Sequence, residues 1–327
     1  MFDIITFGSA SQDIYLKSQK FLPVLSKEFA TGKGICLSLG SKIEVEDIFF
    51  TSGGGGTNTA ATFASQGFKV AYCGMLGDDN FGKLIISELK KYGINTSLVK
   101  KTEKMPTNIA VLLMPPGGER TILVYRGASD LLEKKDIPWD KIKKTKWVYL
   151  APFSGKLTEI TEELVAFAKK NKIRVALNPG YNQLTLPEPI LQNILKEIDV
   201  LILNREEASL LTKIPYQKEE EIFKKIDQLT PGIAIMTKGR EGAVVSDGKY
   251  LYRAESLGMK LVDGTGAGDA FGSGFVSGLI QKNDIIYAIQ LAMANSNFTI
   301  TKFGAKEGVL HKNQSWPKIK VFKESCL

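Results

Sequence analysis

Short apolar runs alternate with helical patterns along most of the chain. The apolar runs predict buried strands at 3–8, 69–76, 146–152, 173–179, 200–204 and 232–239. Apolar residues at helical spacing predict helices at 57–67, 80–93 and 156–171, the first two ending in glycine. Strands joined by helical crossovers indicate a mostly parallel sheet with helices on both faces. We therefore expect one three-layer α/β/α sandwich domain spanning residues 1–327.

Two segments break this alternation. Residues 14–51 are rich in strand and turn patterns without a long helix, and residues 106–127 predict a hairpin around a Pro-Pro-Gly-Gly turn. Inserts of this kind form a small second sheet beside the main one, and over the mouth of a pocket such a sheet is a lid. Lid sheets also pair edge to edge between subunits, which protects their unpaired backbone groups. We therefore expect a β-sheet lid and a homodimer formed through it.

The composition is that of an ordinary globular protein, with 43% hydrophobic and 24% charged residues. No run of 18 apolar residues predicts a membrane span, and the N-terminus lacks the basic region of a signal peptide. Cys36, Cys73 and Cys326 are too few and too scattered for a disulfide framework or a zinc site. These features favour the cytoplasm and exclude a membrane partner.

The net charge of +8 suits either a nucleic-acid partner or a lysine-rich, solvated surface. The lysines are dispersed among acidic residues, and no arginine-rich patch with interleaved aromatics is present, which favours the solvated surface over nucleic acid. The single histidine, His311, lies in a polar C-terminal segment, so a Ser-His-Asp or Cys-His relay would depend on it. A carboxylate is therefore favoured as general base.

The stretch LVDGTGAGDAFGSGF (261–275) is a glycine-rich loop that runs into a helix. Glycines let backbone N–H groups turn inward around an anion, and the helix N-terminus adds its positive dipole end. Asp269 falls in the first helical turn, where the dipole keeps a carboxylate ionised and able to accept a proton from a hydroxyl. The other interpretation is a glycine turn with a capping aspartate, but Asp-x-Thr-Gly-Ala-Gly-Asp before a helix is a rarer pattern. It predicts phosphoryl transfer to an alcohol, because positioning and charge neutralisation dominate that chemistry.

This stretch resembles the C-terminal signature of the ribokinase-like (PfkB) family of sugar and nucleoside kinases. Residues 52–82 resemble the family's N-terminal signature, with a double glycine, then Asn58, and a final Gly-Asp-Asp. Further segments fit the family in its order: GSASQD (8–13), LNREEA (203–208), MTKGREGAVV (236–245) and TKFGA (301–305). The resemblance runs from about residue 3 to 305 and implies a ribokinase-like fold with ATP as phosphoryl donor.

The resemblance also implies roles for individual residues. Asp269 would be the base, and the 264–268 loop would form the anion hole through the amides of Gly266, Ala267 and Gly268. The acceptor would be held by Asp13, Gly54 and Asn58. The nucleotide would be bound by Asn204, Thr237, Gly239, Gly242, Gly266 and Gly268. Glu207 would hold Mg²⁺ through water, and Asp263 and Thr265 would lie at a monovalent-cation site for K⁺.

The sequence leaves the identity of the phosphate acceptor open. We expect a hydroxymethyl group of a sugar, with a nucleoside as the alternative and a catalytically inactive binding protein as a third, which the intact Asp269 argues against. Phe49 and Phe50 could cover a base or belong to the core of the lid. Arg126 could reach the pocket, which would favour a carboxylated or phosphorylated sugar, or could be an exposed lid residue.

One stretch imitates a different phosphate-binding motif. Residues 77–84, GDDNFGKL, have the Gly-x4-Gly-Lys spacing of a P-loop, but Leu84 stands where Ser or Thr would bind magnesium. We interpret them as a structural turn and helix start. A dinucleotide-binding loop is equally unsupported, because no strand with an acidic residue follows the glycine-rich loop about 20 residues later.

Overall fold

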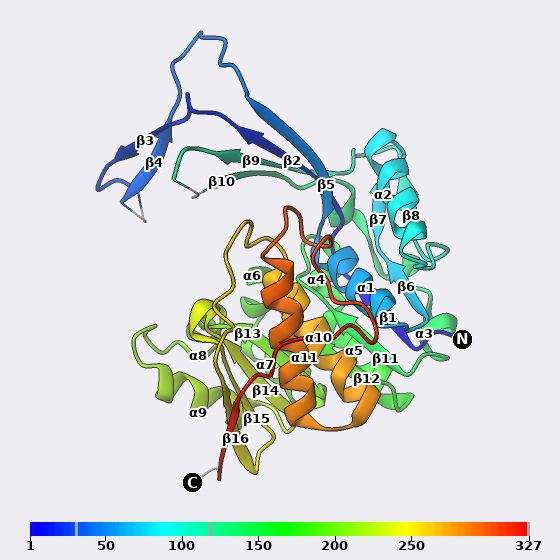
Figure 1. Cartoon of the computed structure of the whole chain (residues 1–327). Helices are drawn as coiled ribbons and strands as arrows, with labels where there is room; N and C mark the ends of the chain where they lie inside the picture. The colour runs from blue at the N-terminus through cyan, green and yellow to red at the C-terminus, as the bar shows by residue number, and fades with distance from the viewer. Residues whose placement is uncertain (30–31, 118–119, 326–327) are drawn as a thin grey trace.

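The computed structural model describes residues 1–29, 32–117 and 120–325. Its main sheet has nine strands in the order β17-β16-β15-β14-β13-β12-β11-β1-β6 (Figure 1). Their bounds are β1 Ile4–Phe7, β6 Val70–Cys73, β11 Trp147–Leu150, β12 Arg174–Leu177, β13 Val200–Asn204, β14 Ile233–Thr237, β15 Ala243–Ser246, β16 Tyr250–Ala254 and β17 Val321–Ser325. The strands from β6 to β14 are parallel, and β15 to β17 continue antiparallel. The mostly parallel sheet is therefore confirmed.

Helices cover both faces of this sheet. They are α1 Gly55–Ser65, α2 Asn80–Lys91, α3 Trp139–Ile142, α4 Lys156–Glu159, α5 Thr161–Lys170, α6 Tyr181–Leu184, α7 Glu188–Glu197, α8 Arg205–Thr212, α9 Glu219–Leu229, α10 Ala267–Lys282 and α11 Ile285–Thr299. One hydrophobic cluster joins α1, α10 and α11 to the sheet, and a second joins α5, α7, α8 and α9 to the opposite face. Strands β1 and β11 are buried at every position, as a sheet covered on both faces requires. Within the described ranges, no helix combines the length and apolarity needed to cross a membrane.

The helix that follows the glycine-rich loop is locked against its neighbour. A Cβ atom on Gly274 would lie 3.0 Å from the Cα of Ala292, and one on Gly278 would lie 2.5 Å from the Cα of Ala288. The absence of side chains at these two positions therefore lets α10 and α11 approach closely. The tight pair gives the loop before α10 a rigid support.

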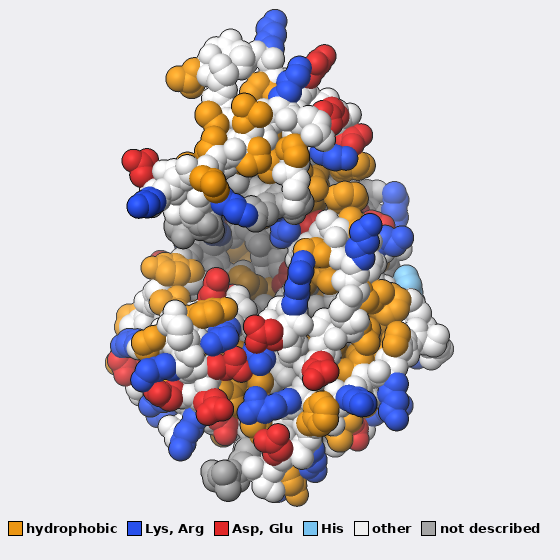
Figure 2. Space-filling model, turned by 60° about the vertical axis from the view of Figure 1, so that its left-hand side comes forward, with side chains coloured by type: hydrophobic (Ala, Val, Ile, Leu, Met, Phe, Trp, Pro, Cys, Tyr) orange, Lys and Arg blue, Asp and Glu red, His pale blue; other side chains and the backbone are white. Residues whose placement is uncertain are grey.

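A separate four-stranded sheet stands beyond one end of the main sheet (Figure 1). We call it the small sheet; its order is β10-β9-β2-β5, with β2 Ser11–Lys17, β5 Asp47–Gly53, β9 Asn108–Met114 and β10 Thr121–Tyr125. Strands β9 and β10 form the hairpin expected around the Pro-Pro-Gly-Gly turn, whose last glycine lies outside the described residues. Figure 2 shows the molecule hollowed between this upper part and the main body.

The first insert extends slightly beyond the bounds of about 14–51 expected for it. Its two strands in the small sheet run from Ser11 to Lys17 and from Asp47 to Gly53, so Asp13 lies on β2 of the small sheet. Between Lys17 and Asp47, which pair in register, the chain leaves the sheet. It forms a separate hairpin there, β3 Leu22–Leu25 with β4 Lys33–Cys36. The hairpin is largely exposed, whereas β2 is buried or half-buried along most of its length.

Two predicted elements are each divided in the structure. The strand expected at 69–76 breaks at Gly74, where a Cβ atom would lie 2.0 Å from the Tyr72 hydroxyl oxygen. Beyond this point β7 Met75–Gly77 pairs with β8 Lys100–Thr102, outside the main sheet. The helix expected at 156–171 is interrupted at Ile160 between α4 and α5.

Candidate active site

The glycine-rich loop meets the N-terminus of α10 as expected. Gly266 is the residue before the helix, with a φ of +76°, and a Cβ atom there would lie 2.4 Å from the Cβ of Ala305. Only glycine tolerates both the left-handed backbone and this close approach. The first amides of a helix have no partner within it and point along the positive dipole end. The loop at 264–268 therefore has the chemistry of an anion site.

A cavity of about 590 Å³ lies beside this loop. Thr237, Gly239 and Gly242, at the end of β14 and in the turn that follows it, line the cavity together with Ala267 and Gly268. Its apolar wall includes Phe271, Met293 and Ile300. The cavity thus combines an apolar surface for a planar ring with backbone donors for an anion. Four of the predicted nucleotide-binding residues, Thr237, Gly239, Gly242 and Gly268, thus line one groove with Ala267, whereas Asn204 and Gly266 are not among its lining residues.

Asp269 lies on the other side of the loop, toward the small sheet. Its Oδ2 accepts a 2.8 Å hydrogen bond from Nδ2 of Asn58, on α1. The Oδ1 of Asn58 is buried and has no hydrogen-bond partner in the described part of the chain, so it is free to accept a hydrogen bond from a hydroxyl group. Gly54 starts α1 with a φ of +94°, and a Cβ atom on it would lie 2.4 Å from the carbonyl oxygen of Ser9. The hydrogen bond from Asn58 therefore brings a residue expected to hold the acceptor into contact with Asp269, the expected base. We call Asp13, Gly54 and Asn58 the acceptor group.

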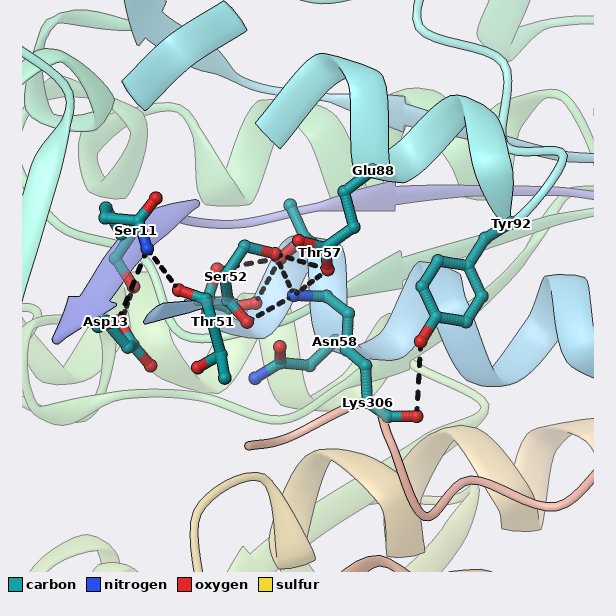
Figure 3. A network of polar contacts seen from close by, with 12 residues as sticks. Ser11, Asp13, Thr51, Ser52, Thr57, Asn58, Glu88, Tyr92 and Lys306 are labelled. Atoms are coloured by element: carbon teal, nitrogen blue, oxygen red, sulfur yellow. Dashed lines mark hydrogen bonds and ion pairs between the residues drawn. The ribbon is translucent and has the colours of Figure 1, made fainter. Parts of the chain in front are cut away.

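Asp13 completes this group from β2 (Figure 3). Its carboxylate accepts a 2.7 Å hydrogen bond from the Ser11 hydroxyl and packs directly on Gly53, where a Cβ atom would lie 2.1 Å from Oδ2. Burial raises the pKa of Asp13 to about 6, against the opposing effects of the Ser11 hydrogen bond and the Lys306 charge. Burial likewise raises the pKa of Asp269, while the Asn58 hydrogen bond and the Lys306 charge lower it. Two buried carboxylates with raised pKa values, both near the charge of Lys306, are typical of a functional site.

Asp263 is surrounded by hydrogen-bond donors. Its Oδ1 accepts from the amide and hydroxyl of Thr265 at 3.0 and 2.7 Å, and its Oδ2 accepts from the Tyr15 hydroxyl at 2.7 Å. The guanidinium of Arg120 lies 3.5 Å from Oδ1. Burial alone would raise the pKa of Asp263, but the hydrogen bonds from Tyr15, Thr265 and Gly304 outweigh it and lower the pKa. The ionised carboxylate favours a cation at this position.

Asn204 and Glu207 form a capping box at the start of α8. The amide of Glu207 donates to Oδ1 of Asn204 at 2.8 Å, and the amide of Asn204 donates to Oε2 of Glu207 at 2.9 Å. Burial raises the pKa of Glu207, and the charge of Asp269 raises it further, so the two carboxylates lie within electrostatic reach of each other. Carboxylate and amide oxygens are ligands that a magnesium ion prefers.

The other residues singled out from the sequence have different surroundings in the structure: Arg126, Phe49 and Phe50, the P-loop-like stretch 77–84, and His311. Arg126 is exposed just after β10. Phe49 stacks on Phe303 with ring centroids 5.1 Å apart, while Phe50 is 59% exposed. In the P-loop-like stretch, Asp79 caps α2 by accepting from the amide of Gly82, so the stretch is a turn and helix start. His311 is exposed, away from these residues.

Sequence reasoning missed Tyr15, Arg120 and Lys306. Tyr15 lies two residues after Asp13 and therefore on the same face of β2, a signal the alternating pattern contained. Lys306 directly follows the TKFGA segment, but its burial on the far side of the acceptor group has no signal in the sequence.

Comparisons with known proteins identify the family of this chain. Residues 1–313 match the family described as pfkB family carbohydrate kinase. A ribokinase of Lactococcus lactis is 30% identical over 303 residues, which cover 90% of this chain and 95% of that protein. A 5-dehydro-2-deoxygluconokinase of Clostridium perfringens is 28% identical over 289 residues, covering 83% and 82% of the two chains.

Solved structures show the same fold. Ribokinase of Arabidopsis thaliana, in complex with ribose and ATP, superposes with a TM-score of 0.78 at 23% identity, over 95% of this chain and 96% of the other. A putative ribokinase II from E. coli, in complex with ATP and Mg²⁺, gives 0.77 at 18% identity, over 94% and 96%. The three-layer fold with a separate small sheet is therefore ribokinase-like. The chain belongs to the pfkB family and is an ATP-dependent carbohydrate kinase.

Proposed function

We propose that this protein transfers the γ-phosphoryl group of ATP to a hydroxymethyl group of a sugar. Asp269 acts as the base that accepts the hydroxyl proton, and the 264–268 loop holds the transferred group through the amides of Gly266, Ala267 and Gly268. One observation carries the proposal: the Asp269 carboxylate, oriented by Asn58, stands in the first turn of α10 between the nucleotide groove and the acceptor group. This is the position from which a base reaches an acceptor hydroxyl in line with a bound phosphate.

The acceptor side follows from the polar groups that line it. Asp13 and the free Oδ1 of Asn58 are acceptors for vicinal hydroxyls, and Gly54 leaves the backbone open to the sugar. In our proposal Arg126 contacts the outer end of the acceptor when the small sheet closes as a lid. Its exposed guanidinium makes a carboxylated or phosphorylated sugar a good candidate.

Two ions belong to the proposal. Glu207 would hold Mg²⁺ through water, beside the phosphates that Asn204 helps to organise; the ion would neutralise phosphate charge. Asp263 and Thr265 would hold K⁺ near the anion loop, and the lowered pKa of Asp263 favours a cation there. Arg120, 3.5 Å from the same carboxylate, competes with K⁺ for it.

The nucleoside alternative has less support. A base needs an aromatic or apolar surface to stack on, and Phe49 and Phe50 were the sequence's candidates. Phe49 is already stacked on Phe303, which uses one of its faces. Phe50 remains exposed and keeps the alternative open to test. An inactive binding protein is disfavoured by the complete Asp269, Asn58 and loop arrangement.

The assembly and location are also part of the proposal. Strand β10 is an edge of the small sheet and exposes Ile122, Leu123, Val124 and Tyr125. Figure 2 shows hydrophobic side chains gathered over this upper part of the molecule. Because an exposed apolar edge is a surface for pairing, we propose a cytoplasmic homodimer formed through the small sheet. The whole chain would act as one domain that carries this lid.

The deciding experiment is ADP release measured over a panel of sugars, sugar acids, sugar phosphates and nucleosides. The proposal expects a sugar or sugar derivative to give the highest kcat/KM. A nucleoside as best acceptor would replace it with the alternative, and no acceptor-dependent ADP release from the panel would contradict it.

A further inference from the structure

A buried lysine lies beneath the acceptor group. The Lys306 side chain, in the segment after α11, is only 2% exposed. Lysine is rarely buried to this degree without compensating partners, because moving an ammonium group out of water is costly. Its position therefore calls for an explanation in terms of what surrounds it.

The ammonium group is held at the end of β5 (Figure 3). Its Nζ donates to both the carbonyl oxygen and the hydroxyl of Ser52, each at 2.6 Å. The Ser52 hydroxyl in turn donates to Oε1 of Glu88 at 2.7 Å, and Nζ lies 3.6 Å from the same oxygen. Lys306, Ser52 and Glu88 thus form one connected network that joins three separate parts of the chain.

This network lies directly behind the acceptor residues. Ser52 precedes Gly53, on which the Asp13 carboxylate packs, and it pairs in register with Gln12 on β2. Holding the Ser52 carbonyl therefore fixes the backbone surface against which Asp13 rests.

The charged groups around Lys306 are carboxylates from three different elements. Burial lowers the pKa of Lys306, while the charges of Glu88 on α2, Asp13 on β2 and Asp269 on α10 raise it. The Tyr92 hydroxyl, just after α2, donates to the Lys306 backbone carbonyl oxygen. Asp13 also feels the charge of Asp263, and Asp269 lies within electrostatic reach of Glu207 and Tyr149. Burial and the charges of Asp263 and Glu88 raise the pKa of Asp13, and burial raises the pKa of Asp269. Lys306 opposes this, since its charge lowers the pKa of both Asp13 and Asp269.

We propose that Lys306 is a positioning residue of the acceptor site, whose buried ammonium group fixes the end of β5 behind Asp13 and keeps Asp13 and Asp269 ionised. Asp269 must be ionised to accept the hydroxyl proton, so this inference rests on the function proposed above. Lys306 itself touches neither the acceptor nor the phosphate and acts through the two aspartates.

The test is the pH dependence of kcat/KM for the best acceptor, in wild type and in Lys306→Gln. Without the ammonium charge, the acidic limb of the profile should move to higher pH by about one unit, the size of shift that a close opposite charge produces. Glu88→Gln is the matched control, because the charge of Glu88 raises the pKa of Asp13. It should move the limb in the opposite direction. A uniform loss of activity without any shift would show that Lys306 only fills space, and would overturn the inference.

A second measurement does not depend on catalysis. ¹³C NMR of aspartate-labelled protein, with the Asp13 signal assigned from Asp13→Asn, reports the titration of Asp13 directly. We expect a higher midpoint in Lys306→Gln and a lower one in Glu88→Gln. If Lys306→Gln does not fold, the double variant Lys306→Gln/Glu88→Gln removes both charges of the network, and Glu88→Gln alone still tests the sign. Unchanged Asp13 titration in the folded variants overturns the inference, whereas a wild type without kinase activity but with the expected NMR shifts contradicts only the proposed function.

Discussion

The phenolic hydroxyl of Tyr15 donates a 2.7 Å hydrogen bond to Oδ2 of Asp263, and both side chains are buried. Tyr15 belongs to β2 of the small sheet, while Asp263 begins the glycine-rich loop. The rings of Tyr15 and Phe303 also form a T-shaped, edge-to-face contact with centroids 6.2 Å apart. One side chain therefore links the small sheet to the loop that carries the proposed anion hole.

Tyr15→Phe should lower the free energy of unfolding by about 1–3 kcal/mol, the typical worth of a buried hydrogen bond to a charged group. The bond helps to lower the pKa of Asp263, so its stabilisation is present when Asp263 is ionised and disappears as the pH falls through that pKa. Urea unfolding at neutral and at acidic pH checks this. An equal loss at both pH values would point to packing and not to the hydrogen bond.

Asp269→Asn should abolish turnover while ATP still binds. The amides that hold phosphate remain, but an amide side chain cannot accept the hydroxyl proton, so kcat should fall by at least ~10²-fold. The measurements are kcat on the best acceptor and ATP affinity by calorimetry. Turnover like that of the wild type would show that Asp269 is not the base, and a loss of fold would show that its role is structural.

Potassium should raise activity relative to sodium or Tris, because Asp263 is ionised beside the anion loop. Arg120 shares this carboxylate, so Arg120→Gln should make activity depend more strongly on potassium. Initial rates at saturating substrates, in each salt and for both proteins, provide the check. Equal rates in all salts for both proteins would remove the cation site and leave the kinase assignment unaffected.

Asp13→Asn should stabilise the protein at neutral pH while weakening acceptor binding. The pKa of Asp13 in the folded protein, about 6, is above its ordinary value, so the ionised carboxylate costs stability above that pH. The cost vanishes as the pH falls and the carboxyl group becomes protonated. We expect a gain of roughly 1–3 kcal/mol at neutral pH that shrinks under acidic conditions. Thermal unfolding across pH tests it, and a destabilised variant at neutral pH would contradict the burial argument.

The sequence predicted the features that depend on local pattern. Apolar runs and glycine stops located the parallel strands and the helix after the loop, and the order Asp263 to Asp269 indicated phosphate chemistry. The two inserts stood out because they lacked helical periodicity. These signals are short-range, so each can be read within a few residues.

The structural features that the sequence did not predict depend on contacts between segments that are far apart in the chain. After Gly74 the chain leaves the main sheet and β7 pairs with β8, at residues 100–102. Lys17 likewise pairs with Asp47, thirty residues later. Lys306 and Ser52 are 254 residues apart in sequence yet share two hydrogen bonds. No pattern along the chain reports such a pairing, because it exists only once both segments are packed.

The register between Lys17 and Asp47 has a consequence for how this protein could diversify. The chain leaves the small sheet after Lys17 and re-enters it at Asp47, which pairs with Lys17. The segment between them, which we call the attachment, therefore starts and ends at one place on the sheet. The entropic cost of closing such a loop grows only slowly with its length. The attachment can therefore be lengthened, shortened or exchanged in evolution without shifting Asp13, four residues before its root. It is a module that can change in length or sequence while Asp13 and the residues around it stay constant.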